Sequence, residues 1–338
     1  MKNNTFSHLL SCYLTKYLPG IAGLSTNTIM SYRDMFKNLI VFYEAELNIK
    51  PEKIAIEDFN SENITSFLKW LESTRGNSVS SINVRLASIH AFTRYVERNL
   101  PESIYIMQKI LSIPYKKCPS SSPVFMSAKA TKILLAMPND NTQNNRRDKV
   151  ILSLLYDSGA RVQELCDLTV SALRLDEPCT VKLTGKGKKT RIVPIMSSMA
   201  DLLRQYLKER SLDISCCSCY PLFVNRCGRK FTRKGITYIL KKYFTHARQL
   251  YPGMFPDKIS PHCLRHSKSM HLLQAGVNLI YIRDILGHAD IKTTEIYARI
   301  DSEMKRKALE KASLGIVTEK MPPWHEDKKL FDWLRELG

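Results

Sequence analysis

The chain has 338 residues, more than one ordinary domain needs, which predicts two domains with separate cores. Its hydrophobic fraction of 44% and charged fraction of 25% are typical of a soluble globular protein. No apolar run approaches the ~20 residues that span a bilayer, and the first residues lack the continuous apolar stretch of a signal peptide. We therefore expect a cytoplasmic protein with no membrane partner.

The formal net charge of +19 is the strongest feature of the composition. Residues 1–115 contain 12 Lys+Arg and 10 Asp+Glu, whereas residues 116–338 contain 39 and 22. The positive excess therefore lies in the second part of the chain, which indicates a polyanionic partner, usually nucleic acid. Anionic lipid is the alternative, but no basic amphipathic stretch with a continuous apolar face supports it.

The nine cysteines are an odd number in a chain without an export signal, which predicts reduced thiols. Four of them cluster at Cys216, Cys217, Cys219 and Cys227. Structural zinc sites usually pair their ligands as C-x2-C, and no second pair follows here. Ordinary loop thiols are favoured over a zinc site, so we expect no bound metal.

Apolar residues recur every three or four positions in the first 113 residues, which predicts a helical bundle. One run follows the capping candidates Ser25–Thr28, a second ends at Gly76, and a third begins at Ser80. The apolar positions are Ile29, Tyr32, Phe36, Leu39, Ile40 and Tyr43 in the first run, Ile64, Phe67, Leu68 and Leu71 in the second, and Ile82, Leu86, Ile89, Phe92 and Val96 in the third.

Residues 114–123 contain three prolines, three serines and two lysines, a composition that cannot sustain a helix and favours extended chain. This segment is predicted to be a linker. It separates a helical domain at 1–113 from a second domain at 124–315, which is followed by a tail at 316–338. Such a tether lets two domains grip opposite sides of a duplex.

The second domain is predicted to combine helices with a small antiparallel β-sheet, so the fold class is mainly α. Thr180–Thr184 and Thr190–Pro194 alternate with period two around Gly185-Lys186-Gly187-Lys188, which predicts a hairpin with a basic tip. Helices are expected near Ser198, Arg233, His262, Ile280 and Lys292.

The segment His262-Cys263-Leu264-Arg265-His266 places three polar side chains on one face of a helix. Arginine offers two parallel N–H donors that match phosphate oxygens and stays charged, and histidine carries a proton near neutral pH. A phosphate site is one interpretation, and a solvated polar helix face is the other.

His288 and Tyr297 lie nine residues apart, which places them ~180° apart on one straight helix. Gly287 and the capping candidate Asp290 offer a break, so that a new helix from Lys292 can turn Tyr297 toward the same site. For an isolated tyrosine, a half-buried core position is the alternative.

Arg161 follows a turn that contains Gly159, at the start of an expected helix, where its side chain can point into a cleft. Lys186 lies at the tip of the predicted hairpin. For both residues an ordinary surface position is the alternative when each is taken alone.

In combination, these motifs resemble the tyrosine recombinases, the family of phage, Xer and transposon integrases. Five motifs in the expected order make a specific pattern over roughly residues 125–300. They are Gly159-x-Arg161-x-x-Glu164-Leu165, Gly185-Lys186-Gly187-x-Lys189-x-Arg191-x-Val193-Pro194, His262-x-Leu264-Arg265-His266, Leu286-Gly287-His288, and Tyr297. In the first domain, the segment from Ser80 to Phe92 resembles the DNA-facing helix of the family's SAM-like core-binding domain.

The resemblance implies a role for each matched residue. Tyr297 is expected to attack the scissile phosphate and to form a 3′-phosphotyrosyl bond. Arg161 and Arg265 are expected to hold that phosphate, and His288 to hydrogen-bond it as charge builds. The stored bond energy makes ATP unnecessary.

Two further matched residues are expected to move protons. Lys186 resembles the general acid for the leaving 5′ oxygen, and His262 the proton acceptor for the tyrosine. A free tyrosine has a pKa near ~10, so nearby cationic groups are needed to favour the phenolate. Fixed cationic side chains then meet the charge that a metal meets in other enzymes, and we expect no cofactor.

The implied substrate is double-stranded DNA with inverted-repeat core sites, contacted by Arg85, Lys188, Lys189 and Arg191. Strand exchange through a Holliday junction requires two protomers per site and four per synapse, so self-association is expected, with sibling recombinases as further partners.

Two other classes remain open. A type IB topoisomerase or telomere resolvase shares the chemistry, and a DNA-binding regulator would lack activity. The residues of the motifs and the small helical first domain favour a recombinase over a topoisomerase or telomere resolvase. The full catalytic set and the charge in the second domain disfavour the latter.

The tail predicts a short amphipathic helix behind a proline break at Pro322-Pro323, with apolar positions Leu330, Phe331, Leu334 and Leu337. It is expected either to dock on a neighbouring protomer or to pack on its own domain.

Overall fold

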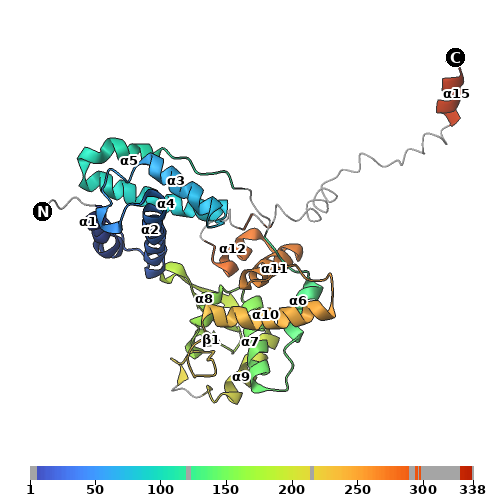
Figure 1. Cartoon of the computed structure of the whole chain (residues 1–338). Coiled ribbons are helices and arrows are strands. Elements are labelled where there is room, and N and C mark those ends of the chain that lie inside the picture. The colour runs from blue at the N-terminus through green and yellow to red at the C-terminus, as the bar shows by residue number, and fades with distance from the viewer. Residues whose placement is uncertain are drawn as a thin grey trace. The chain divides into compact units, whose positions relative to one another are not determined.

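The computed structural model describes residues 6–118, 123–213, 217–288, 294–295, 297 and 328–336. The chain divides into two compact units, Met1–Ser120 and Ser121–Gly338. Both are mainly helical, and a three-stranded antiparallel sheet belongs to the second unit (Figure 1). The predicted fold class is confirmed.

The first unit is a helical bundle whose helix starts are fixed by side-chain caps. Ser25, Asn60 and Ser78 each accept a hydrogen bond from a backbone N–H in the first turn of the following helix. The elements are α1 (Phe6–Cys12), the π-helix η1 (Tyr13–Ile21), α2 (Thr26–Leu47), η2 (Pro51–Lys53), α3 (Ser61–Ser73), α4 (Val79–Asn99), η3 (Pro101–Ser103) and α5 (Ile104–Leu111).

The core of this unit is built around aromatic rings. Phe92 on α4 contacts Phe36 on α2 edge to face, with ring centroids 4.9 Å apart. Phe6 and Phe59 contact the same ring at 5.9 and 5.4 Å. These contacts fix α4, on which the predicted DNA contact Arg85 is half-buried beside the buried Leu86.

The chain that follows α5 is held against the first unit. Asn83 on α4 donates to the Lys116 carbonyl at 2.8 Å and accepts from the Lys116 N–H at 3.0 Å. Lys116 also pairs with Glu72 on α3. His90 donates to the Ile110 carbonyl through Nε2, so its Nδ1 accepts from the Tyr115 hydroxyl. The first residues of the predicted linker are therefore held against α3 and α4 of the first unit.

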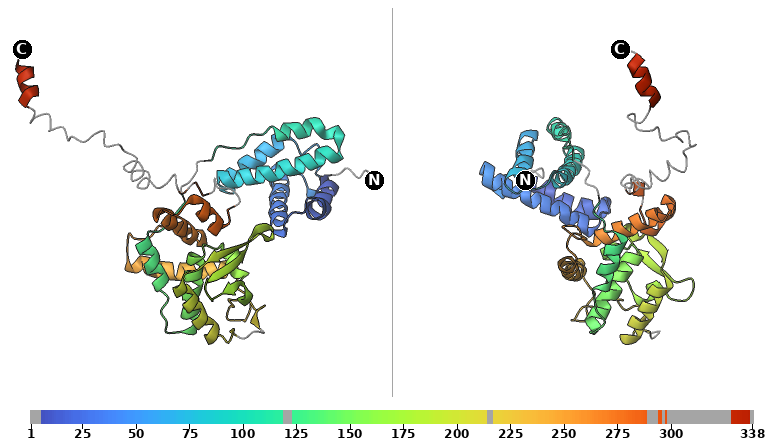
Figure 2. Two further views of the ribbon diagram at one scale, coloured as in Figure 1. Left: turned by 180° about the vertical axis from the view of Figure 1, so that it is seen from behind. Right: turned by 90° about the vertical axis from the view of Figure 1, so that its right-hand side faces the viewer.

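The second unit combines helices with the predicted hairpin (Figure 2). Strands β2 and β3 pair from Thr180↔Pro194 to Thr184↔Thr190, and β1 pairs with the outer edge of β2. The elements are α6 (Ala128–Ala136), α7 (Gln143–Asp157), α8 (Val162–Cys166), η4 (Val170–Ala172), β1 (Leu173–Arg174), β2 (Thr180–Thr184), η5 (Lys186–Lys188), β3 (Thr190–Pro194), α9 (Ser197–Glu209), α10 (Arg233–Leu250), α11 (Pro261–Gln274), α12 (Leu279–Leu286) and α15 (Lys328–Glu336).

Helix α7 is the centre of the second core. It is buried between α9 and α11, and its residues Val150–Leu152, Leu154 and Leu155 have almost no exposed surface. Helix α11 also contacts α6, α10 and α12, so its position is determined from several sides. This matters because α11 carries the His262–His266 motif.

The chain that enters this unit is anchored to α11. The Met126 N–H donates to Ser267 Oγ at 2.8 Å, and His271 Nε2 donates to the Met126 carbonyl at 3.0 Å. Because Nε2 of the neutral ring carries the proton, Nδ1 accepts from the Tyr156 hydroxyl at 2.8 Å.

The tail contains the expected helix, α15, on which Trp333 and Leu334 are exposed. The proline break at Pro322-Pro323 and the helix start near Lys292 lie outside the described residues. Within the described ranges, no helix is both long and apolar enough to cross a membrane.

We predict that Asn83→Ala loosens the chain after α5. The substitution removes two hydrogen bonds worth about 0.5–1.5 kcal/mol each, so trypsin should cut after Lys116 or Lys117 roughly ten times faster. Intact-mass measurement of the fragments checks this. Asn99→Ala, which removes a bond within α4 only, is the control. Equal cutting of both variants would contradict the anchoring role.

Candidate active site

Arg265 on α11 is the most deeply buried of the arginines at the site, with 3% of its surface exposed. Its Nη1 donates to the Gly159 carbonyl at 2.7 Å and its Nη2 to the Leu286 carbonyl at 2.5 Å. The guanidinium therefore joins the turn before α8 to the end of α12. Burial, followed by the charges of Arg161 and Arg191, lowers the pKa of Arg265 to about 9.

Arg161 stands immediately before α8 and points to the same place. Its backbone N–H and its Nη1 both donate to Glu164 in the first turn of α8, at 2.8 and 2.9 Å. Its Nη2 donates to the Gly287 carbonyl at 3.2 Å, and 37% of the side chain is exposed. Arg161 is thus oriented by protein groups yet accessible to a ligand.

Arg191 on β3 holds Glu164 from the other side. Its two Nη atoms donate to both carboxylate oxygens at 3.0 and 2.7 Å, and its Nε donates to the Ile285 carbonyl at 2.8 Å. The side chain is only 12% exposed. A DNA contact by Arg191 stays a prediction, but these donors are already engaged with protein acceptors.

The Glu164 carboxylate is ionised although it is almost fully buried. Burial by itself raises its pKa, but hydrogen bonds from Arg191 and Arg161 and the Arg191 charge outweigh burial and lower the pKa to about 2. One negative charge therefore sits among the three arginines 161, 191 and 265.

Two glycines of the sequence motifs are required by this packing. A Cβ on Gly185 would lie 2.9 Å from the Glu164 Oε1 atom. Gly287 ends α12 with φ of 64°, and a Cβ there would lie 2.8 Å from Arg191 Cδ. Only glycine lets the backbone come this close to the buried ion pairs.

His288 follows directly after Gly287, so the predicted break at Gly287 is confirmed and turns the histidine toward the arginines. Its Nδ1 is hydrogen-bonded to Thr294 Oγ1 at 2.9 Å. Burial, then the charges of Arg265 and Arg161, lower its pKa to about 4, so the ring is neutral at pH 7. The other expected break residue, Asp290, lies outside the described residues.

Tyr297 is buried, with 3% of its surface exposed, among Met270, Leu273, Ile282 and Leu286. Its Oη lies 2.7 Å from Nδ1 of His266, one turn beyond His262 on α11. The family resemblance implies the proton-acceptor role for His262, whereas His266 makes the contact in the structure.

His262 is exposed and faces the arginines rather than Tyr297. Partial burial, then the charges of Arg265 and Arg161, lower its pKa. The structure therefore gathers Arg161, Arg265, His262, His288 and Tyr297 around the turns at Gly159 and Gly287.

The hairpin tip is a single turn of η5 between β2 and β3, closed by a hydrogen bond from the Gly185 N–H to the Lys189 carbonyl at 2.8 Å. Lys186 begins this turn, and its side chain lies outside the described part of the chain. Lys188 and Lys189 are exposed in the same turn, and their contact with DNA stays a prediction.

From the sequence, neither Glu164 nor His266 was given a role in the site, and Arg191 was expected to contact DNA. A signal existed for Arg191, because it stands two residues before the buried Val193 on the same face of β3. The contacts between residues 164 and 191 and between residues 266 and 297 are long-range and leave no periodic pattern.

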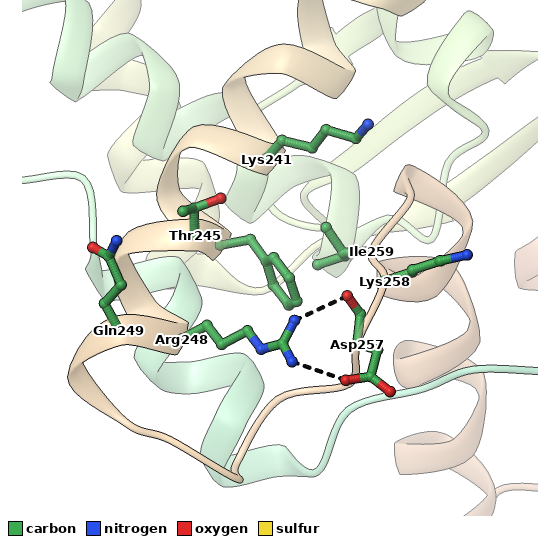
Figure 3. A pocket seen from close by; sticks show the side chains of 8 residues that line it. Lys241, Thr245, Arg248, Gln249, Asp257, Lys258 and Ile259 are labelled. Carbon is green, nitrogen blue, oxygen red and sulfur yellow. Dashed lines mark hydrogen bonds and ion pairs between the residues drawn. The ribbon is translucent and has the colours of Figure 1, made fainter.

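A groove of about 590 Å³ lies apart from these residues, between α10 and the loop before α11 (Figure 3). Arg248 closes one side by donating to the Asp257 carbonyl at 3.1 Å and to its carboxylate at 2.8 Å. The groove contains none of the predicted site residues. In the described ranges, which omit Cys216, no group of three His, Cys, Asp or Glu side chains is arranged to hold a metal ion.

The fold and the gathered arginines, histidines and tyrosine define the class of tyrosine recombinases. Residues 124–304 match the phage integrase family, and residues 13–99 match the phage integrase N-terminal SAM-like domain. The chain belongs to the phage integrase family and is a tyrosine-type site-specific recombinase.

Known relatives match over most of the chain. It is 32% identical to tyrosine recombinase XerC of Thermodesulfovibrio yellowstonii, over 86% of this chain and 92% of that one. It is 36% identical to tyrosine recombinase XerD of Oceanobacillus iheyensis, over 82% and 89%. The fold is similar to that of the Tn1549 transposon integrase in complex with transposon right end DNA, with a TM-score of 0.70 at 16% identity, over 90% and 99%.

We predict that Glu164→Gln lowers the free energy of unfolding by about 3 kcal/mol at pH 7, because the ionised carboxylate pairs with two arginines. Its folded pKa is depressed, so this stability is present above pH ~4.5 and is lost as pH falls toward ~2. Urea unfolding of both proteins from pH 7 to pH 3 should show the gap closing.

The matched control is Glu209→Gln, which breaks the more exposed pair with Arg146 and should cost less stability. A gap between wild type and Glu164→Gln that stays constant over this pH range would show that the Glu164 charge does not support the fold.

Proposed function

We propose that the protein cuts and rejoins DNA through a covalent bond between Tyr297 and the 3′ phosphate of the cleaved strand. The observation that carries the proposal is the convergence of Arg161 and Arg265 on the turns at Gly159 and Gly287, with His288 beside them. A phosphodiester placed there meets two fixed guanidiniums in a site that burial has already desolvated.

The chemistry follows from this placement. Tyr297 Oη forms a bond to phosphorus while the bond from phosphorus to the 5′ oxygen breaks. Arg161 and Arg265 offset the charge that grows on the phosphate oxygens, and His288 hydrogen-bonds one of them. Attack on the phosphotyrosyl bond by a different 5′ hydroxyl rejoins the strands without ATP.

Lys186 is proposed to protonate the leaving 5′ oxygen from the hairpin tip, with Lys188 and Lys189 on the adjoining DNA backbone. Arg85 of the 1–113 unit is proposed to contact the duplex as the core-binding domain. The net +17 of residues 116–338 supports extensive phosphate contact by the 124–315 catalytic domain.

The proposed reaction is strand exchange through a Holliday junction in a tetramer bound to inverted-repeat core sites, as in movement or resolution of a mobile element. Such an assembly requires contacts between protomers. The exposed Trp333 and Leu334 of α15 support a docking role for the 316–338 tail on a neighbouring protomer.

Covalent trapping tests the nucleophile. A library of nicked, 5′-labelled duplexes with randomised arms is incubated with the protein, and the DNA recovered in denaturant-resistant adducts gives the target. On that duplex Tyr297→Phe should form no adduct while still binding, and Arg161→Ala should slow adduct formation roughly 10²–10³-fold.

The other classes predict different results in the same assay. Binding without any adduct from wild type would identify a regulator. Adducts that relax supercoiled DNA but never join two duplexes would identify a topoisomerase.

The tail is tested by deleting residues 322–338. If α15 docks between protomers, single-duplex binding is retained and paired complexes, measured by native gel and light scattering, are lost. Trp333→Ala should weaken pairing and Asp332→Asn, a polar exposed neighbour, should not. Intact pairing after the deletion would contradict docking in trans.

A further inference from the structure

The base in contact with the Tyr297 hydroxyl is His266 rather than His262, the histidine to which the family resemblance gives the proton-acceptor role. His266 Nδ1 lies 2.7 Å from Tyr297 Oη, a short hydrogen bond, and the two rings are tilted by 54° with centroids 5.7 Å apart. The His262 ring is 6.3 Å from the His266 ring, on the exposed side of α11. His262 therefore faces the phosphate side and His266 the nucleophile.

The burial of Tyr297 makes a contacting base necessary. Burial raises the pKa of Tyr297, and the nearby Ser269 hydroxyl and the Arg265 charge only partly offset this. The phenol is therefore protonated at neutral pH. Its attack on phosphorus must release a proton inside a largely apolar pocket, where water has little access.

The ring of His266 is neutral and able to accept that proton. Burial, followed by the charges of His262 and Arg265, lowers its pKa to about 4. A neutral imidazole carries one N–H and one lone pair, so with the proton on Nε2 the lone pair of Nδ1 accepts from the phenol. Among the described residues, the charged or titratable groups that face it are His262 and Arg265 on α11, His288 after α12, and Tyr297.

Bound DNA is expected to raise the proton affinity of His266. The negative phosphodiester bound by Arg161 and Arg265 offsets the positive charge that disfavours protonation of His266. Proton acceptance is therefore weakest in the empty site and strongest when the scissile phosphate is in place. Such coupling protects the nucleophile from ionising before substrate is bound.

On this basis we infer that His266 is a catalytic residue that takes the phenolic proton of Tyr297 during DNA cleavage. The O–H bond of Tyr297 breaks as its electron pair forms the bond to phosphorus, and the proton moves to Nδ1. The pair of the breaking P–O bond leaves on the 5′ oxygen, which takes its proton from Lys186. The inference rests on the proposed function and moves the acceptor role from His262 to His266.

The test combines a His266 variant with a more acidic nucleophile. His266→Gln should slow adduct formation on the nicked duplex by about 10²-fold, within the usual range for a general base. A ring-fluorinated tyrosine at position 297 ionises at lower pH and needs less help from a base. It should therefore recover at least a tenth of the wild-type rate in His266→Gln.

His262→Gln carrying the same fluorinated tyrosine is the matched control, and its rate should not recover. Each rescue compares tyrosine with fluorinated tyrosine at position 297 in the same His variant, so a smaller folded fraction affects both rates equally. His266→Asn provides a second variant in which the same comparison is made. An unchanged rate in His266→Gln, or rescue in His262→Gln alone, overturns the inference. An adduct formed by Tyr297→Phe would instead overturn the proposed function.

Discussion

The carboxylate of Glu164 lies between the guanidiniums of Arg161 and Arg191, and through them it joins α8, β3 and the end of α12. An unpaired carboxylate at this depth would cost several kcal/mol, so the chain must bring both arginines to it. Because Arg191 occupies both oxygens, Arg161 is not drawn wholly into the ion pair. One of its nitrogens reaches the Gly287 turn, and more than a third of its side chain remains accessible.

Burial and the surrounding positive charge keep His266 and His288 neutral. Burial is the largest cause of the lowered pKa values of His266 and His288, and nearby positive charge adds to it, with Arg265 acting on both rings and Arg161 and Arg191 on His288. The positive charge of the arginines is only partly compensated until an anion binds. A phosphodiester supplies the missing charge, which links substrate binding to the protonation of the groups around it.

Much of the fold could be predicted from the sequence, because helices α2, α3 and α4 and the β2–β3 hairpin follow local periodicity and caps. The helix end at Gly287 could be predicted because glycine readily adopts the left-handed conformation with which many helices end. The partner of Tyr297 was not predictable in the same manner. Whether His262 or His266 reaches the phenol depends on how α11 is rotated against a residue 31 positions away, and spacing alone does not fix that rotation.

The chain between the two units is fastened at Lys116 by Asn83 and at Met126 by Ser267 and His271. Ten residue steps, at about 3.3–3.6 Å each, give this segment a maximum stretch of roughly 35 Å. The two fastening points can never separate farther than that while both hold. While the Met126 anchor holds, tension on the chain that enters the second unit would act on Ser267 and His271 of α11, the helix that also carries Arg265 and His266.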